Sequence, residues 1–213
     1  RVLGDNEDSV ETVEDTERPW PPIFEDLFTD GGWSSVRDHI KAGADVNETI
    51  NLHGVEGLSI LTICAEQGDV ETMKLLVEAG ADINARQKNI ELASGYNSPL
   101  VASLKGGNMG HFDYLIECGA DVDPFHDKES GWTPLVQAAH HVNNAAIKTL
   151  LERGADVNIA NADSANAFKT VCHHTTAAAR KCMRTLIKAG ADTSRADNEG
   201  YAGIHNVAAS QSS

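Results

Sequence analysis

The chain has 213 residues, a formal net charge of −15, and a composition that is 41% hydrophobic but only 5% aromatic. This hydrophobic content excludes a wholly disordered chain and predicts a core of Leu, Ile, Val and Ala within one or two domains. The acidic charge argues against nucleic acid and anionic membranes as partners, and no apolar run approaches the roughly 18 residues of a transmembrane helix.

The first stretch of the chain differs in composition from the rest. Residues 1–18 hold seven acidic and two basic residues and few large apolar ones. Such a segment buries too little surface to order itself, so we expect a disordered or extended acidic tail over residues 1–21. We expect the folded domain to span residues 22–213, with Trp20 as an apolar anchor before its first helix.

A pair of short helices is predicted between residues 57 and 84. Apolar residues recur there at helical spacing on two faces, which consist of Leu61, Cys64, Ala65, Met73, Leu76 and Val77. Gly68 separates the two faces, and Gly80 stands where a left-handed glycine ends a helix. The segment is therefore interpreted as a helical hairpin.

The end of this hairpin recurs along the chain as a GAD triplet. The five triplets begin at Gly43, Gly80, Gly119, Gly154 and Gly190, at spacings of 37, 39, 35 and 36 residues. Together with openings such as "GWTPLVQAA" at residues 131–139, this pattern resembles the ankyrin repeat, a 33-residue unit of two helices and a β-turn finger. The resemblance covers about residues 22–213 and implies an all-α ankyrin-repeat solenoid of five units and a terminal half unit.

The unequal spacings are explained by the segments that correspond to the fingers. Each of the first four hairpins spans the same 21 residues, whereas the first three fingers hold 11, 13 and nine residues, compared with seven in a plain unit. In the first hairpin, Phe24, Leu27 and Phe28 are expected to form the apolar face. The fifth hairpin is aligned to begin at Asn166, which leaves three extra residues in the turn between its helices.

Four histidines take equivalent places in consecutive units. His140 and His141 match His173 and His174, so stacking should bring the two pairs side by side. They are either solvated helix-end residues or a metal-binding or pH-sensitive patch, because imidazole binds transition metals and titrates near neutral pH. We favour the first interpretation and predict no metal site.

Several finger residues are candidates for contact with a partner. Trp132 and Tyr201 precede helix openings, where the resemblance implies exposure to partners, and Trp and Tyr are enriched in interface hot spots. For Trp132, packing on the neighbouring finger is an alternative of similar weight. Other candidates are His53, Glu56, Arg86, Lys88, Tyr96 and Phe125 on the fingers, together with the four histidines His140, His141, His173 and His174. The finger asparagines Asn47, Asn84 and Asn158 are expected to stabilise turns.

The sequence therefore predicts a non-catalytic module that binds one or more proteins through its fingers and concave inner-helix face. No phosphate-binding loop or nucleophile motif is present, so neither an enzyme nor a cofactor is expected, and a small-molecule ligand is not favoured. The alternative is a permanently assembled subunit of a larger, possibly organellar complex. The four scattered cysteines indicate a reducing intracellular compartment, and the start at Arg1 is compatible with a removed targeting peptide.

Overall fold

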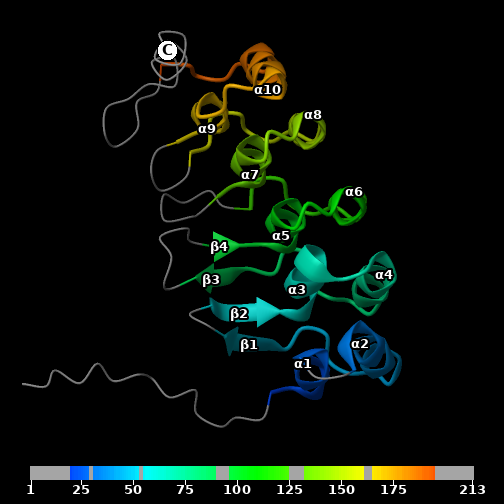
Figure 1. Cartoon of the computed structure of the whole chain (residues 1–213). Helices are drawn as coiled ribbons and strands as arrows, with labels where there is room; N and C mark the ends of the chain where they lie inside the picture. The colour runs from blue at the N-terminus through cyan, green and yellow to red at the C-terminus, as the bar shows by residue number, and fades with distance from the viewer. Residues whose placement is uncertain are drawn as a thin grey trace, which may run out of the picture.

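The computed structural model describes residues 20–28, 31–52, 55–89, 96–124, 132–160 and 165–194, with the backbone alone at residues 88, 89, 96 and 97. Its inner helices are α1 (Pro22–Glu25), α3 (Ile60–Gln67), α5 (Pro99–Lys105), α7 (Pro134–His140) and α9 (Ala167–Cys172). Its outer helices are α2 (Gly32–Lys41), α4 (Val70–Glu78), α6 (Met109–Glu117), α8 (Asn144–Glu152) and α10 (Ala177–Lys188). The two sets form parallel columns, and the fingers project beside the inner column (Figure 1). None of the described helices is both long enough and apolar enough to cross a membrane.

The ends of the helices are determined by local sequence. At the start of α3, for example, the Ser59 hydroxyl accepts a hydrogen bond from the Thr62 N–H, and Thr133 caps α7 in the same way. The glycines that open the five GAD triplets all have left-handed backbone torsions, with φ between 86° and 92°. These torsions end the outer helices as the sequence predicted. The predicted 21-residue hairpin is thus a capped helix pair with a glycine stop.

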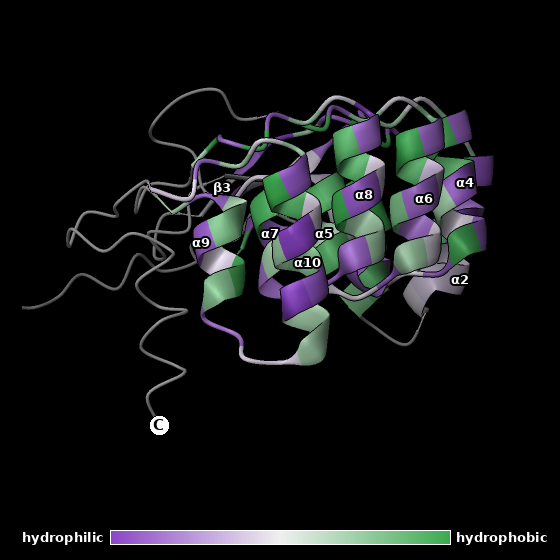
Figure 2. Ribbon diagram, turned by 90° about the horizontal axis from the view of Figure 1, so that it is seen from above, coloured by the Kyte–Doolittle hydropathy of each residue, from purple (hydrophilic) through white to green (hydrophobic). Residues whose placement is uncertain are grey.

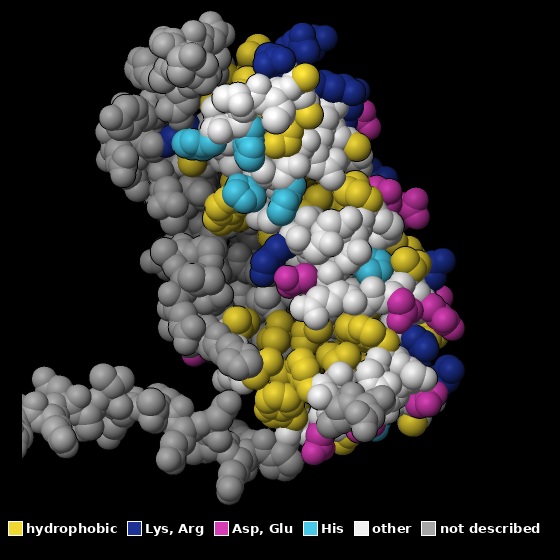
Figure 3. Space-filling view, in the orientation of Figure 1, with side chains coloured by type: hydrophobic (Ala, Val, Ile, Leu, Met, Phe, Trp, Pro, Cys, Tyr) yellow, Lys and Arg dark blue, Asp and Glu magenta, His cyan; other side chains and the backbone are white. Residues whose placement is uncertain are grey.

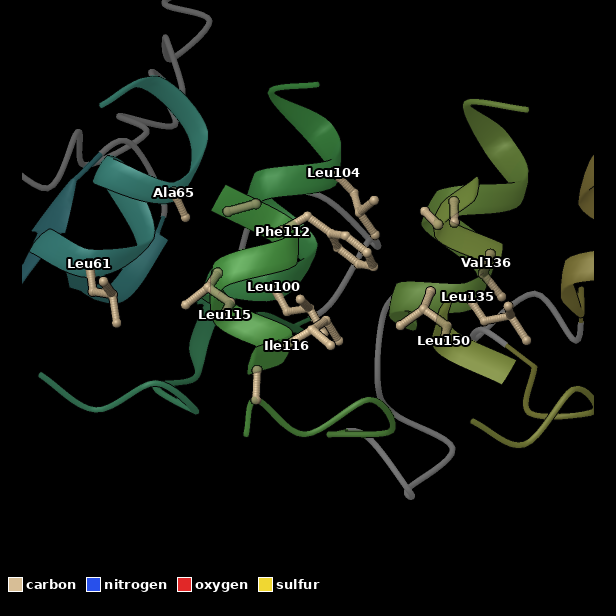
Figure 4. Close-up of a cluster of buried hydrophobic side chains, with 14 of the residues drawn as sticks. Leu61, Ala65, Leu100, Leu104, Phe112, Leu115, Ile116, Leu135, Val136 and Leu150 are labelled. Atoms are coloured by element: carbon tan, nitrogen blue, oxygen red, sulfur yellow. The ribbon is translucent and has the colours of Figure 1, made fainter. Parts of the chain in front are cut away.

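The core is continuous along the solenoid rather than divided between units. Helix α3 packs against α5, and α7 packs against both α5 and α9. Phe112, Leu115 and Leu150 are completely buried and lie within the shared cluster of Figure 4. The outer helices are hydrophilic on the side that faces away from this core (Figure 2). Each unit therefore depends on its neighbours to bury its apolar faces.

The finger asparagines do more than stabilise their own turns. Asn47 donates from Nδ2 to the Gly80 carbonyl at 3.0 Å and accepts from the Asp82 N–H at 2.8 Å. Asn158 makes the equivalent pair of bonds to Gly190 and Asp192 one unit further on. Because each donor and acceptor lies in the next GAD segment, these side chains bond consecutive units together.

The two longest fingers form a small antiparallel sheet, which we call the finger sheet. Its strands are β1 (Thr49–Leu52), β2 (Val55–Ser59), β3 (Gln87–Asn89) and β4 (Tyr96–Asn97), in that spatial order. Strands β2 and β3 belong to different fingers, so their pairing joins two units through the backbone. The all-α solenoid is thus extended by a sheet built from the residues added to its fingers.

Two details of the predicted hairpins are corrected by the structure. Phe28 is not part of the first apolar face: it is 49% exposed and packs edge-on against Trp20, while Ile23 is buried beside Phe24. A short 3-10 helix, η1 (Asp26–Phe28), turns Phe28 outward. In the fifth unit, the extra residues mainly lengthen the outer helix, since α10 has 12 residues whereas α8 has nine.

All four cysteines are free thiols, and three of them are buried. Burial raises the pKa of Cys64 to about 12 and the pKa of Cys172 to about 11. Since the thiolate is the reactive form, these two side chains are unreactive packing groups.

Candidate partner-binding surface

The inner helices end at equivalent places, so their last residues line up along one face of the solenoid. We call this the inner face; it consists of the inner-helix ends and the adjoining finger segments. At its N-terminal half, the Lys105 ammonium lies 3.3 Å from the Glu66 carboxylate. In the next two units the same alignment brings His140 and His173 to the equivalent positions. The inner face therefore changes from a charged pair to imidazoles along its length.

The predicted histidine pairs do meet. The ring centroid of His140 lies 5.3 Å from that of His141 and 6.2 Å from that of His174 in the next unit. Together with His173 these residues form what we call the histidine cluster, and Figure 3 shows histidine side chains gathered over α7 and α9. The alignment of the two units in the sequence correctly placed these side chains together.

Trp132 forms one edge of the histidine cluster. Its ring contacts the His140 ring edge-on, with centroids 4.7 Å apart and an interplanar angle of 90°. The indole is partly buried and also packs against the hydrophobic core. Trp132 is therefore held at the base of its finger, with its ring against the His140 end of the histidine cluster.

One histidine of the cluster, His140, is less readily protonated than free imidazole. The pKa of His140 is lowered, chiefly by partial burial and further by the neighbouring His141, His174 and His173. Each added proton would place like charges within a few ångströms of one another. At neutral pH the His140 side of the cluster is thus an uncharged aromatic surface.

The turn that follows His141 is conformationally strained. Val142 has a φ of +54°, a left-handed torsion that β-branched residues rarely adopt. Its N–H bonds to the Ala139 carbonyl at 3.0 Å, and its side chain packs against the core. Strain of this kind persists only where surrounding contacts enforce it, and it is common at functional sites.

The same side chains do not form a metal centre in the part of the chain that the structure describes. No group of three His, Cys, Asp or Glu side chains there has a metal-binding arrangement. One imidazole nitrogen is also already engaged, because Nε2 of His141 lies 2.8 Å from Nε2 of Gln137 in a hydrogen bond. The cluster is better suited to contact with aromatic or polar groups of a ligand.

Three of the predicted finger residues come together in the finger sheet. Glu56 is the register partner of Lys88 across β2 and β3, and Lys88 is the partner of Tyr96 across β3 and β4. Their backbone positions therefore form one row across three strands, while Arg86 is exposed just before β3. Three other candidates lie outside the described residues: His53, Phe125 and Tyr201.

Four inner-face residues were not predicted from the sequence. Gln137 bonds to His141, the Glu66–Lys105 pair lies on the same line as the histidines, and Gly106 allows α5 to approach the Glu66 carbonyl closely. The signal for them was available, because the constant hairpin length aligns Glu66 and Lys105 with His140.

Stacked helical hairpins with finger turns and one continuous face of helix ends define a helical repeat protein. Residues 61–161 match the family model for ankyrin repeats, in three copies. The chain therefore contains ankyrin repeats, as its sequence predicted. Ankyrin repeats generally mediate protein–protein interaction and are typically non-catalytic.

Curated relatives share the repeats within much longer proteins. Ankyrin repeat protein nuc-2 of Neurospora crassa is 34% identical over 141 residues, which is 64% of this chain and 12% of that protein. Mouse ankyrin repeat and SAM domain-containing protein 6 is 34% identical over 96 residues, covering 45% of this chain and 11% of the relative. Human mitochondrial disaggregase is 35% identical over 77 residues, covering 36% of this chain and 10% of the relative. The chain thus spans about a tenth of the length of each.

Proposed function

We propose that this protein is a non-catalytic module that binds a segment of a partner protein along its inner face. The main support is the contact of Trp132 with the histidine cluster. A Trp side chain that is already held by its neighbours loses little conformational entropy on binding, and Trp is enriched in interface hot spots. The edge of His140 and the imidazole of His174 would then surround a residue inserted beside the indole.

The finger sheet would add a second contact to the same partner. It projects beside the inner helices (Figure 1), so a segment lying along the inner face passes its base. Arg86 is exposed and Lys88 lies in the row with Glu56 and Tyr96, which gives this finger local basic character on an acidic protein. A partner segment with an acidic end over the sheet and an apolar residue at Trp132 would match both regions.

The experiment that tests the proposal compares two Trp variants. Trp132→Ala should abolish most chemical crosslinking and affinity capture of the partner by the full chain. Trp33→Ala is the matched control, because Trp33 lies in outer helix α2, away from the histidine cluster. Both variants should retain helical circular dichroism. If Trp132→Ala loses helicity without a selective loss of capture, or if both variants lose capture equally, the proposal fails.

A second candidate is a permanently assembled subunit of a larger complex. The exposed Phe28 favours it, because a large aromatic side chain that is 49% exposed at one end of the solenoid suits burial against a neighbouring subunit. Gel filtration separates the two functions. A folded monomer supports reversible binding, whereas insolubility of the isolated chain or an inseparable partner supports the subunit.

A further inference from the structure

The last outer helix differs in charge from the other outer helices. Helix α10 contains Arg180, Lys181, Arg184 and Lys188 and no acidic residue. The outer helices α4, α6 and α8 each carry at least one Asp or Glu, and the chain as a whole has a net charge of −15. The four basic residues of α10, which we call the basic stripe, are therefore a local exception on an acidic protein.

The basic stripe lies on one side of its helix. Ala179, Cys182 and Leu186 are buried against the core. At about 100° per residue, the basic residues fall within an arc of about 100° on the opposite side. All four are exposed, and none forms an ion pair with a carboxylate in the described part of the chain. Arg180 is oriented by a hydrogen bond of 3.0 Å to the Thr175 carbonyl.

An apolar side chain adjoins the stripe. Ile187 is 51% exposed, and on the helical projection it lies next to Arg180 and Arg184. An exposed Ile one turn from the Arg184 guanidinium and next to Lys188 can contact an apolar residue while these cations bind carboxylates.

We propose that the basic stripe is a second docking surface, separate from the inner face, for a short acidic segment of a partner protein that carries one apolar residue among its carboxylates. The charge is complementary, and the size is limited: from Arg180 to Lys188 the helix rises about 12 Å. An extended segment covers that distance with about four residues at roughly 3.3 Å each.

The restricted size favours a polypeptide over longer or wider polyanions. The Debye length is about 8 Å at physiological ionic strength, so a ligand bound to the stripe also interacts with protein charges that lie just beyond it. A nucleic acid or a membrane surface extending past α10 would approach the acidic remainder of the molecule and be repelled. A short acidic segment contacts the stripe alone and avoids that repulsion.

The test measures fluorescence anisotropy with two labelled hexapeptides, Glu-Glu-Glu-Glu-Glu-Glu and Glu-Glu-Leu-Glu-Glu-Glu, added to the full chain at low and at physiological salt. Both should bind, more weakly at higher salt, and the leucine peptide should bind more tightly. The double variant R184Q/K188Q should lose about tenfold or more in affinity for both peptides, since it removes two of the four cations. Ile187→Ser should remove only the advantage of the leucine peptide.

The matched control is K41Q/K148Q, which makes the same change in net charge on outer helices α2 and α8. It should change affinity by less than about twofold if the stripe is the site. Equal losses in the two double variants, or no binding to the unmodified chain, overturn the proposal. Tighter binding to a 12-nucleotide single strand or to phosphatidylserine vesicles would assign the stripe to nucleic acid or membrane and also overturn it. Trp132→Ala should leave peptide binding unchanged, so this test is independent of the inner face.

Discussion

The two halves of the inner face place different chemistry on the same scaffold positions. In the N-terminal half, Glu66 and Lys105 form an ion pair at 3.3 Å, and Gly106 allows α5 to pack closely on the end of α3. In the C-terminal half, the equivalent positions carry the histidine cluster, with Trp132 against His140. The difference teaches that the hairpin is repeated while the residues at the two positions that end each inner helix differ from unit to unit. Surface properties in this protein are therefore set by few residues.

The largest expected loss of stability comes from adding a side chain at Gly106, where α5 lies against the backbone at the end of α3. A Cβ at position 106 would overlap the Glu66 carbonyl, which is backbone and cannot rotate away. Gly106→Ala should therefore lower the free energy of unfolding by about 2 kcal/mol, measured by urea denaturation. In Gly110→Ala, the control, the new Cβ would meet only Val70 at 3.8 Å within a helix, so stability should rise by about 0.5 kcal/mol. Equal effects of the two substitutions would show that the approach is not tight.

A second prediction compares the asparagine hydrogen bonds that join consecutive units near the two ends of the solenoid. Asn158→Ala removes hydrogen bonds to the Gly190 carbonyl and the Asp192 N–H and should cost about 1 kcal/mol. Asn47→Ala removes the same two kinds of bond, but β2–β3 pairing also holds its two units together. We therefore expect the smaller loss for Asn47→Ala in urea denaturation. A larger loss for Asn47→Ala would mean that the finger sheet does not stabilise this junction.

The sequence predicts those features of the two halves that depend on local periodicity, but not those that depend on contacts between separate fingers. The hairpins, their glycine stops and the meeting of His140 with His174 follow from local periodicity and a constant register, and the structure confirms them. The pairing of β2 with β3 could not be predicted, because it depends on two fingers of unequal length reaching the same edge. The outward turn of Phe28 likewise depends on the short helix η1. The partner-binding roles of the candidate residues remain predictions.

The ion pair in the N-terminal half should contribute little to stability. Lys105 and Glu66 have side-chain exposures of 58% and 27%, and water screens pairs of this kind. Lys105→Gln should therefore change the free energy of unfolding by about 0.5 kcal/mol or less. A urea titration at low and high salt provides the measurement. A loss as large as that of Gly106→Ala would show that the pair, and not the close helix approach, holds α3 against α5.

The smallest predicted effect on stability belongs to the C-terminal half and depends on pH. Because the pKa of His140 is lowered in the folded state by partial burial and by His141, His174 and His173, the unfolded chain binds a proton more readily. Stability from this site should be complete above the unfolded pKa of about 6.5 and should decline as the pH falls below it. His140→Gln should flatten that decline between pH 7.5 and 5.5, measured as the urea midpoint. Lys105→Gln, at the equivalent position in the other half, should leave this decline in stability unchanged. If His140→Gln declined with pH as steeply as the unmodified chain, His140 would not be the group responsible. The inner face would then differ between its halves in how it responds to protons as well as in what it presents to a partner.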